Sequence, residues 1–177
     1  VDEIRYKISP KKITADQRLN VMEEAHKIGM KSTATMVIGF GETLEQRIEH
    51  MQKIKELQEK TGGFRAFITW TFQPGNTELG GKKTNAWEYL RTLAVTRIYL
   101  DNIEHIQGSW VTQGQETGQI TLAFGANDLG SIMLEENVVR AAGTAYEMSI
   151  NKMVNLITAS GKIPAQRDTE YNIIKKF

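Results

Sequence analysis

Residues 31–42 read KSTATMVIGFGE, a run that passes from a strand pattern into a glycine-punctuated loop. Within it, residues 33–39 are rich in β-branched and other apolar side chains, which predicts a short buried strand. Gly39 and Gly41 interrupt the run, and Thr43 then opens a T-x-x-Q capping box, the pattern that begins a helix. The stretch therefore predicts a strand, a tight loop and a helix in direct succession.

The rest of the chain repeats this order of strand, polar loop and helix. A capping box at Thr14 predicts a helix that ends near Gly29. Residues 64–72 alternate and are rich in aromatic side chains, which predicts a second strand, and a helix should begin after Asn85. The remaining expected elements are a third strand over residues 105–112, a helix over 113–123, a short fourth strand ending at Asn127 and Asp128, a helix from Thr144 to Gly161, and an irregular polar tail over 162–177 that packs back on the body.

Apolar residues at helical spacing assign a buried stripe to the first and third of these helices. His26 adjoins the first stripe, where a surface or boundary position is the favoured interpretation. The two stripes are Leu19, Met22, Ala25 and Ile28 in the first helix, and Trp87, Leu90, Ala94 and Ile98 in the helix after Asn85.

The composition is that of an ordinary globular protein. The 177 residues are 40% hydrophobic and 24% charged, and the formal net charge is +1, which gives no argument for a nucleic acid or an anionic membrane as partner. No apolar run approaches the roughly 20 residues that span a bilayer, so a cytoplasmic location is expected. The chain has no cysteine and three widely separated histidines, so we expect no metal site within it.

Strands that alternate with helices predict a parallel sheet with right-handed crossovers. A closed (β/α)8 barrel needs about 250 residues, so four strand–helix units make either half of such a barrel or a small open sheet. In both cases ligands bind at the carboxyl ends of the strands. That rim would consist of GFGET (39–43), QPGNTEL (73–79), WVTQGQ (110–115) and GANDLGS (125–131).

Two acidic pairs lie near this rim, Glu42 with Glu45 and Glu135 with Glu136. Paired carboxylates can perform acid–base chemistry, but a carboxylate in the first turn of a helix also complements the helix dipole, which is the favoured interpretation of Glu45. The sequence contains no P-loop, no G-x-G-x-x-G fingerprint and no Ser/His/Asp ordering, so hydrolase, NTPase and dinucleotide-binding functions are disfavoured.

Two glycines of the rim and two tryptophans each admit two interpretations. Gly39 and Gly41 either supply positive φ angles for a turn or allow a ligand to approach the backbone, and the spacing does not decide between these. Trp110 is more often rim packing than a stacking platform, and Trp70 lies mid-strand, where a core position is favoured. From the residues alone, we expect an α/β scaffold that carries a ligand-binding rim.

Several of these stretches resemble motifs of radical S-adenosylmethionine enzymes. VIGFGET (37–43) is similar to their G-x-I-x-G-x-x-E motif, QPGNTEL to the P-x-x-G-T-x-L loop after the next strand, and FGANDLG (124–130) to a last-strand segment. Five longer stretches in order, from SPKKITADQ (9–17) to FGANDLGSIMLEENVVRAAGT (124–144), resemble the dehypoxanthine futalosine cyclase family of menaquinone biosynthesis. Its close relatives are aminofutalosine synthase and F0 synthase. The resemblance covers Ser9 to Tyr171.

The resemblance implies the C-terminal half of a radical-SAM (β/α)8 barrel, strands five to eight, over residues 1–130, followed by a helical extension over 131–177. Family members hold a [4Fe–4S] cluster on a C-x-x-x-C-x-x-C loop, which this cysteine-free chain does not contain. The opening residues, VDEIRYKISPKK (1–12), read as a connecting segment, so we expect part of a larger protein whose N-terminal half supplies the cluster.

The resemblance also implies site residues. Those bordering the S-adenosylmethionine cofactor would be Val37, Gly39, Gly41, Glu42, Gln73, Pro74, Gly75 and Thr77, with Glu42 fixing the loop rather than reacting. Candidates for contact with the substrate, dehypoxanthine futalosine, are Thr69, Trp70, Trp110, Gln113, Asn127, Asp128 and Glu135. In the complete enzyme a 5′-deoxyadenosyl radical would abstract a ribose hydrogen, and addition of the sugar radical to the benzoate ring would close a spirocycle.

Three alternatives stand beside this hypothesis. The chain could come from aminofutalosine synthase or an F0-synthase subunit. It could be an inactive half-barrel that self-associates as a homo-oligomer, because an open half-sheet leaves two strand edges unpaired. An unrelated small α/β binding protein would require the string of motifs to be a coincidence.

Overall fold

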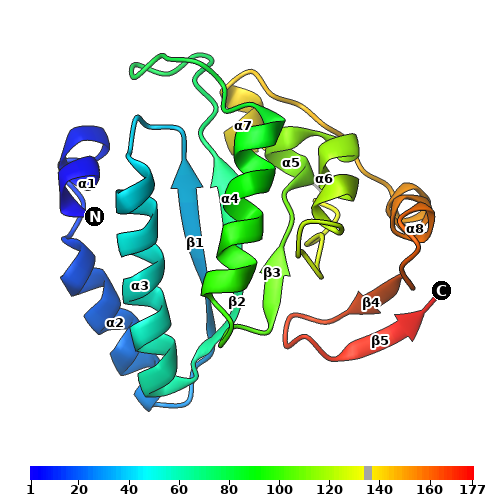
Figure 1. Ribbon diagram of the computed structural model, residues 1–177, viewed down its shortest axis with the longest axis horizontal. Coiled ribbons are helices and arrows are strands. Elements are labelled where there is room, and N and C mark those ends of the chain that lie inside the picture. Colours follow the sequence, from blue (N-terminus) through cyan, green and yellow to red (C-terminus); the bar gives the residue numbers. More distant parts are fainter. Residues whose placement is uncertain (134–136) are drawn as a thin grey trace.

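The computed structural model describes residues 1–133 and 137–177. At its centre lies a parallel sheet whose strands stand in the order β1 (Ser32–Ile38), β2 (Phe64–Thr71) and β3 (His105–Gln107). The helices α3 (Leu44–Thr61) and α4 (Ala86–Tyr99) connect successive strands and lie against the same side of the sheet (Figure 1). The alternating α/β architecture and the first two strands are therefore confirmed.

Alternation along β1 separates the two faces of the sheet. Met36 and Ile38 are buried against the helices, whereas Val37 is 39% exposed on the opposite face, which we call the open face. Residues paired in a parallel sheet point the same way. The register therefore puts Trp70, opposite Val37, on the open face, and Thr69, opposite Met36, on the helix face.

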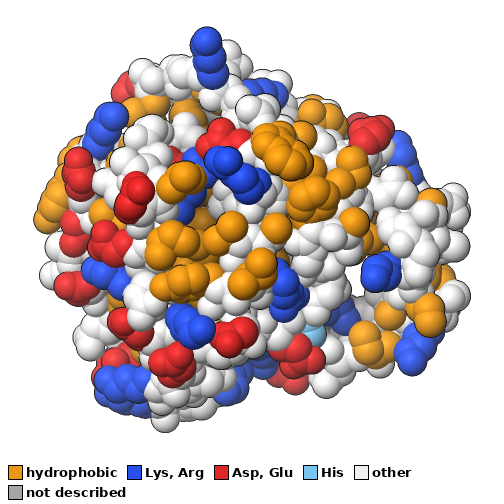
Figure 2. All heavy atoms as spheres, viewed as in Figure 1, with side chains coloured by type: hydrophobic (Ala, Val, Ile, Leu, Met, Phe, Trp, Pro, Cys, Tyr) orange, Lys and Arg blue, Asp and Glu red, His pale blue; other side chains and the backbone are white. Residues whose placement is uncertain are grey.

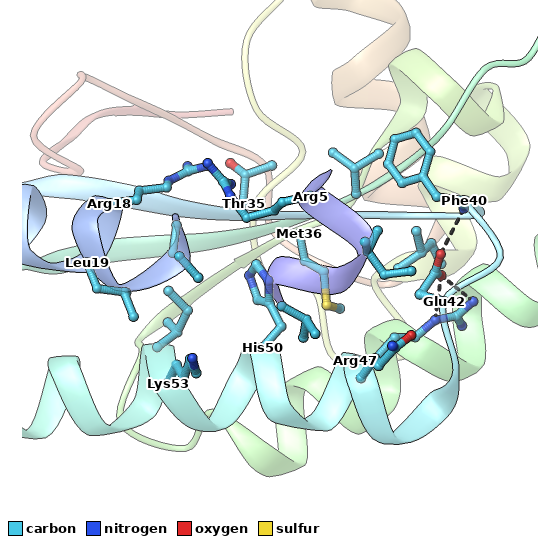
Figure 3. Close-up of a pocket in the computed structure, with 18 of the residues that line it drawn as sticks. Arg5, Arg18, Leu19, Thr35, Met36, Phe40, Glu42, Arg47, His50 and Lys53 are labelled. Carbon is cyan, nitrogen blue, oxygen red and sulfur yellow. Dashed lines mark hydrogen bonds and ion pairs between the residues drawn. The ribbon is translucent and has the colours of Figure 1, made fainter. Parts of the chain in front are cut away.

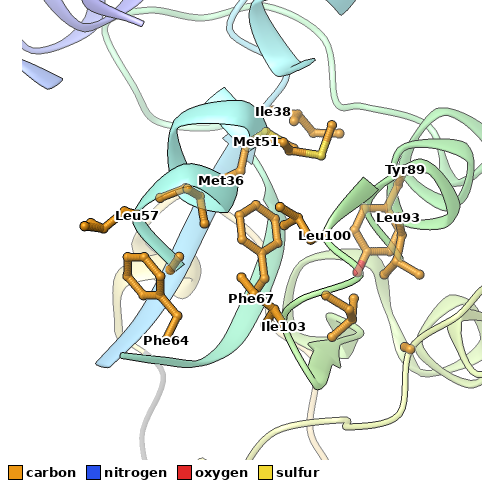
Figure 4. Close-up of a cluster of buried hydrophobic side chains, with 14 of the residues drawn as sticks. Met36, Ile38, Met51, Leu57, Phe64, Phe67, Tyr89, Leu93, Leu100 and Ile103 are labelled. Atoms are coloured by element: carbon orange, nitrogen blue, oxygen red, sulfur yellow. The ribbon is translucent and has the colours of Figure 1, made fainter. Parts of the chain in front are cut away.

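The main hydrophobic core lies between the sheet and its two helices (Figure 4). Phe67 from β2, Met51 from α3 and Leu93 from α4 are almost completely buried there. Each such side chain contributes about 1.5–3 kcal/mol on leaving water, so this layer dominates the stability of the sheet.

The helix starts follow the local capping patterns. The Thr14 hydroxyl accepts from Gln17 N and the Gln17 side chain accepts from Thr14 N, so α2 (Ala15–Lys27) begins with a complete capping box. Thr43 builds the same box for α3, and the Asn85 side chain accepts from Glu88 N at the start of α4. These three helix starts are confirmed because each depends only on residues within one turn.

The predicted stripe of α4 is wrong at its two ends. Trp87 is 66% and Ile98 79% exposed, while Tyr89 and Leu93 are fully buried. Both sets have helical spacing, and the packing of Tyr89 decides which face turns inward, because its hydroxyl accepts from the backbone N–H of Ser109 at 2.7 Å. Apolar side chains consequently gather on the outer surface where α3 and α4 run (Figure 2). Ile28 is likewise exposed, since α2 ends at Lys27.

The third expected strand is shorter than predicted. β3 ends at Gln107, and the following residues form two short helices, α5 (Trp110–Gln113) and α6 (Gln115–Thr121). Ser109 caps α5 by accepting from Thr112 N, so Trp110 and Thr112 are helical rather than extended. The fourth expected strand is reduced to one parallel bridge between Gln107 and Asp128.

The two ends of the chain also differ from expectation. Residues 2–8, expected to be a connecting segment, form the helix α1 (Asp2–Ile8). The late helix α8 (Ile150–Ala159) begins at the cap residue Ser149 rather than at Thr144, and α7 (Asn137–Ala141) precedes it. The tail forms an antiparallel hairpin of β4 (Ala165–Arg167) and β5 (Ile173–Lys176) and, as predicted, packs back on the body, since Tyr171 stacks on His105 with ring centroids 4.3 Å apart.

The predicted surface or boundary position of His26 is wrong. Its ring is buried, with Nδ1 2.8 Å from Thr61 Oγ1 and Nε2 2.8 Å from Ser32 Oγ. It fills the space over Gly63, where an added Cβ would lie 2.0 Å from the ring. His26 therefore ties α2 to the end of α3 and the start of β1.

Within the described ranges, no helix is long and apolar enough to cross a bilayer.

Candidate functional site

The loop after β1 is held by the buried carboxylate of Glu42. Its oxygens accept from the backbone N–H of Gly39 at 2.9 Å and of Phe40 at 2.8 Å. Arg47, from the first turns of α3, donates to the same carboxylate through Nε at 2.9 Å. Because two backbone N–H groups of the turn donate to this one carboxylate, Glu42 holds the loop after β1.

Arg47 joins this loop to the next helix. Its guanidinium also contacts Glu88 Oε1 at 2.5 Å and Thr92 Oγ1 at 2.9 Å, both on α4. The side chains of Arg47 and Glu42 are 6% and 8% exposed. A buried ion pair whose hydrogen bonds are all made costs much to break, so the loop is rigidly held.

The two glycines of the loop differ in what surrounds them. Gly39 has φ +101° and Gly41 φ +87°, so both adopt the left-handed region that side chains other than glycine avoid. A Cβ on Gly39 would lie 2.4 Å from Thr84 Oγ1, whereas one on Gly41 would meet nothing within 4 Å. Gly39 therefore serves close packing within the protein, and Gly41 faces open space at the rim.

The loop after β2 is anchored through the buried amide of Gln73. Its Nε2 lies 3.1 Å from Thr71 Oγ1 and 3.3 Å from the carbonyl of Thr112, and its Oε1 accepts from Thr144 Oγ1 at 2.8 Å. Lys83 donates to the same Thr144 hydroxyl at 2.7 Å. The network ties the loop to α5 and to the segment before α8.

The rest of this loop turns against residues 141–143. The Thr77 hydroxyl donates to the carbonyl of Pro74 at 2.8 Å, which closes a turn. A Cβ on Gly75 would lie 2.4 Å from the carbonyl oxygen of Ala142, so this glycine permits a backbone contact. The loop also adjoins the one after β1, since the Phe40 and Phe72 rings lie 4.6 Å apart. The structure thus brings the two predicted cofactor loops together.

A cavity of about 340 Å³ lies on the open face of the sheet, and we call it the chamber. Ile68, Trp70 and Gln107 form its sheet wall. Its other walls come from the start of α5, from residues 129–133 and from the C-terminal hairpin, through Trp110, Leu129, Met133, Arg167, Thr169 and Tyr171.

The chamber gathers only some of the residues predicted to contact a substrate. Trp70 and Trp110 line it, and Gln113 lies at the rim, where it donates to Thr71 Oγ1 at 2.8 Å. Thr69 lies on the helix face, and Asn127 braces the amino end of β3 by accepting from Ile106 N at 2.9 Å.

The other two predicted substrate residues are Asp128 and Glu135. The Asp128 carboxylate is occupied by an ion pair with Arg167, and Glu135 lies outside the described residues. The substrate roles of all seven residues stay predictions.

Sequence reasoning missed Arg47, Thr84, Gln107 and Arg167. Arg47 follows Glu42 by five positions, a spacing with no simple helical or strand meaning, so only the fold pairs them. Arg167 reaches Asp128 across 39 positions and lies 3.8 Å from the Tyr171 ring centroid. A lone arginine in a polar tail gives no local signal of such a contact.

A second cavity, of about 290 Å³, runs along the edge of β1 that no other described strand pairs (Figure 3). Arg5, Arg18 and Lys53 bring positive charge to it, and His50 points into it from α3 toward Met36. The described part of the chain holds no group of three or more His, Cys, Asp or Glu arranged to bind a metal ion.

His50 should make the protein sensitive to acid. Burial, together with the positive charges of the Val1 amino group, Arg18 and Arg5, lowers its pKa to about 4. An unfolded histidine titrates near 6.5, so the unfolded state binds more protons between pH 6.5 and 4, and stability falls as the pH falls through this window. Burial shifts the pKa of His26 in the same direction.

We expect acidification from pH 7 to 4 to remove about 3 kcal/mol of stability through His50. Urea unfolding at several pH values measures this for the wild type and for His50→Phe, which keeps an aromatic ring but cannot bind a proton. An equally steep loss of stability in the variant would contradict the assignment.

Comparison with known proteins gives the family. A family model described as the CofH/MqnC C-terminal region matches residues 61–176. The chain is 50% identical to a cyclic dehypoxanthine futalosine synthase of Halalkalibacterium halodurans, over 99% of this chain and 48% of that protein. It is 50% identical to the protein of the same name from Streptomyces coelicolor, over 94% and 42%. An aminodeoxyfutalosine synthase of Thermus thermophilus is 38% identical, over 98% and 49%.

The chain spans about half the length of these curated relatives. The family match covers β2, β3, the three rim stretches after residue 61 and the C-terminal hairpin, and the resemblance inferred from the motifs is confirmed. The chain therefore belongs to the CofH/MqnC family and corresponds to its C-terminal region.

Proposed function

We propose that this chain is the C-terminal half of a radical S-adenosylmethionine enzyme that converts dehypoxanthine futalosine to its cyclic product in menaquinone biosynthesis. The observation that carries the proposal is the 50% identity, over nearly the whole chain, to two proteins named for that product. The identity to the aminodeoxyfutalosine synthase is 38%, which makes that activity the second candidate.

The residues of this chain fit one of the two implied cofactors. A [4Fe–4S] cluster needs thiolate ligands and the sequence has no cysteine, so the cluster would be held by the other half of the enzyme. The rim suits S-adenosylmethionine better, because Val37 presents an apolar surface on the open face and an added Cβ on Gly41 would meet no atom within 4 Å. With the cluster, this cofactor supplies the radical that removes a hydrogen atom from the substrate.

This chain would contribute in two ways: it would position the cofactor, and it would exclude water from the substrate. Glu42 and Arg47 hold the loop after β1, and Gln73 holds the loop after β2, so the backbone that would border the cofactor is fixed before it binds. Trp70 and Trp110 line the adjoining chamber and would keep water away from a reactive substrate.

We infer that the N-terminal half of the protein is the partner of this chain. The edge of β1 that no described strand pairs offers backbone groups for a further parallel strand, and the cavity beside it leaves room for side chains. The alternative that is not an enzyme is an inactive half-barrel that self-associates through the same edge. We also propose that the intact protein forms a (β/α)8 barrel and is cytoplasmic. Residues 1–130 would form the C-terminal half of this barrel, and residues 131–177 a helical extension.

The experiment is anaerobic turnover by the intact protein with a reconstituted cluster, S-adenosylmethionine, a reductant and dehypoxanthine futalosine, with products identified by mass spectrometry. We expect a product of cyclisation from the intact protein and none from the chain of 177 residues alone. If an intact protein with about four irons per chain binds S-adenosylmethionine but leaves dehypoxanthine futalosine unchanged, the proposed function is wrong. A light-scattering mass of twice the 20.0 kDa of this chain, with no iron, would instead favour the self-associating fragment.

A further inference from the structure

The amide of Gln73 is the centre of a chain of buried hydrogen bonds that crosses the rim. Gln73 is 6% exposed, and its Nε2 donates to the carbonyls of Thr71 at 3.2 Å and Thr112 at 3.3 Å. Carbonyl oxygens can only accept, so they fix which end of the amide faces them. The other end, Oε1, accepts from Thr144 Oγ1 at 2.8 Å. One amide therefore holds two separate segments, α5 on one side and the stretch before α8 on the other.

The chain of hydrogen bonds continues from α5 to α4. Thr112 Oγ1 lies 2.8 Å from Ser109 Oγ, and the backbone N–H of Ser109 donates to the Tyr89 hydroxyl at 2.7 Å. Tyr89, Ser109 and Thr112 are almost completely buried. Water cannot replace a partner that is lost at such a place, so each of these bonds is costly to break.

Side chains must set the spacing between the loop after β2 and α5, because the sheet does not reach that far. The pairing of β2 with β3 ends at Ile68 and Gln107, before the rim begins. Above that pair, Gln73 reaches Thr112, and Gln113 Nε2 donates to Thr71 Oγ1 at 2.8 Å. The chain of hydrogen bonds thus lies between the loop predicted to border the cofactor and the helix that brings Trp110 to the chamber.

We propose that Gln73 is a positioning residue, which acts through Thr112 and Thr144 to fix α5 and the stretch before α8 against the loop after β2. An amide whose two ends are both bonded inside the protein has a different role from the direct contact with the cofactor that the motif implies. The positioning role rests on the contacts above, and its effect on catalysis rests on the proposed function. Small errors in the placement of reacting groups lower the rate strongly, which is why such a residue matters to the reaction.

The test compares Gln73→Met with Gln58→Met in the intact protein. Methionine has a side chain of similar length that cannot make the hydrogen bonds of an amide. Gln58 is the matched control, because its amide also bonds at both ends but does so at the amino end of the sheet. Its Nε2 donates to the carbonyls of Phe64 and Asn102 at 3.0 and 3.2 Å, and its Oε1 accepts from Phe64 N at 2.8 Å.

The first measurement is amide hydrogen exchange followed by mass spectrometry, which needs no turnover. We expect Gln73→Met to speed exchange about tenfold in residues 110–113 and 144–149 and to leave residues 64–66 unchanged, because local opening becomes easier where the bonds are lost. Gln58→Met should do the reverse. Wild-type exchange rates in residues 110–113 and 144–149 of Gln73→Met would overturn the proposal.

The second measurement is the kinetics of cyclisation. We expect kcat to fall about tenfold in Gln73→Met with KM for dehypoxanthine futalosine unchanged, and Gln58→Met to keep the wild-type kcat. A purely structural role would lower stability in both variants and leave kcat of the folded enzyme unchanged, which would overturn the proposal. A higher KM with an unchanged kcat would also overturn it, since that is the effect of a lost binding contact. If the wild type leaves dehypoxanthine futalosine unchanged, the proposed function is wrong and hydrogen exchange alone decides the positioning role.

If Gln73→Met does not fold, Tyr89→Phe tests the same chain from its other end. Thr96→Val is the control, because it also removes one buried hydroxyl from α4, and that hydroxyl donates within the helix, to the Thr92 carbonyl at 2.9 Å. We expect Tyr89→Phe to speed exchange in residues 110–113 and to lower kcat. Residues 144–149 should exchange as in the wild type, because the bond from Thr144 to Gln73 remains. Exchange and kcat that match those of Thr96→Val would overturn the proposal.

Discussion

Replacement of Arg47 by alanine should destabilise the intact protein by about 3–5 kcal/mol, the cost of leaving a buried charge without its partner. The Glu42 carboxylate would keep its two backbone hydrogen bonds but lose its counter-ion, in a place where it is only 8% exposed. The link from the loop after β1 to Glu88 and Thr92 on α4 would be lost at the same time. The free energy of unfolding in urea, at neutral pH, measures the effect.

Lys53→Ala is the matched control, because Lys53 lies on the same helix and loses a similar amount of side chain. Its partner Asp16 is 81% exposed, so this change should cost less than about 1 kcal/mol. Glu42→Gln, combined with Arg47→Ala in a double-mutant cycle, isolates the coupling between the two side chains. A loss below 1 kcal/mol for Arg47→Ala would contradict a closed ion-pair network.

Replacement of Gly39 by alanine should lower the rate of cyclisation by about 100-fold, on the proposed function. The new Cβ would lie 2.4 Å from Thr84 Oγ1, in a backbone conformation with φ +101°, so the loop after β1 must shift. A displacement of about 1 Å in a loop that positions reactants has an effect of this size. The measurement is kcat/KM of the reconstituted enzyme, with the Kd of S-adenosylmethionine measured separately.

Gly41→Ala separates packing from strain. Gly41 has a similar positive φ of 87°, but its Cβ would meet no atom within 4 Å. If the positive φ alone causes the loss, and the contact with Thr84 adds nothing, both variants should lose a similar free energy of unfolding, about 1–3 kcal/mol. If Gly39→Ala leaves both the rate and the affinity for S-adenosylmethionine unchanged, the close contact with Thr84 does not control the loop. A loss of cofactor affinity in Gly41→Ala alone would place the cofactor against Gly41.

The features that could be predicted from the sequence are those that depend on neighbouring residues. Thr14 and Thr43 begin helices because a hydroxyl and an amide three positions apart satisfy each other. The same pattern at Thr144 fails, since its hydroxyl donates to Gln73, 71 positions away, and the helix begins at Ile150. A local pattern predicts an element only when no distant partner competes for its polar groups.

The other features that the sequence did not predict also depend on contacts between residues that are distant in the chain. Residues 105–112 have strand-like side chains, but Ser109 caps a helix and Trp110 packs against Gly118, so tertiary contacts override propensity after Gln107. The two loops predicted to border the cofactor could be placed side by side from strand order alone. The chamber could not, because its wall from the C-terminal hairpin depends on Arg167, and the sequence around that residue is typical of a solvated tail.

The hairpin has a consequence for the order in which the molecule is assembled. His26 joins residues 6 and 35 positions away, so the layer of β1, α3 and β2 can form while the chain is still growing. Arg65 meets Thr169 across 104 positions, so this contact can form only after residue 169 has left the ribosome. The chamber therefore closes later than the sheet forms, and a nascent chain stalled before Arg167 would have a folded sheet and an open chamber.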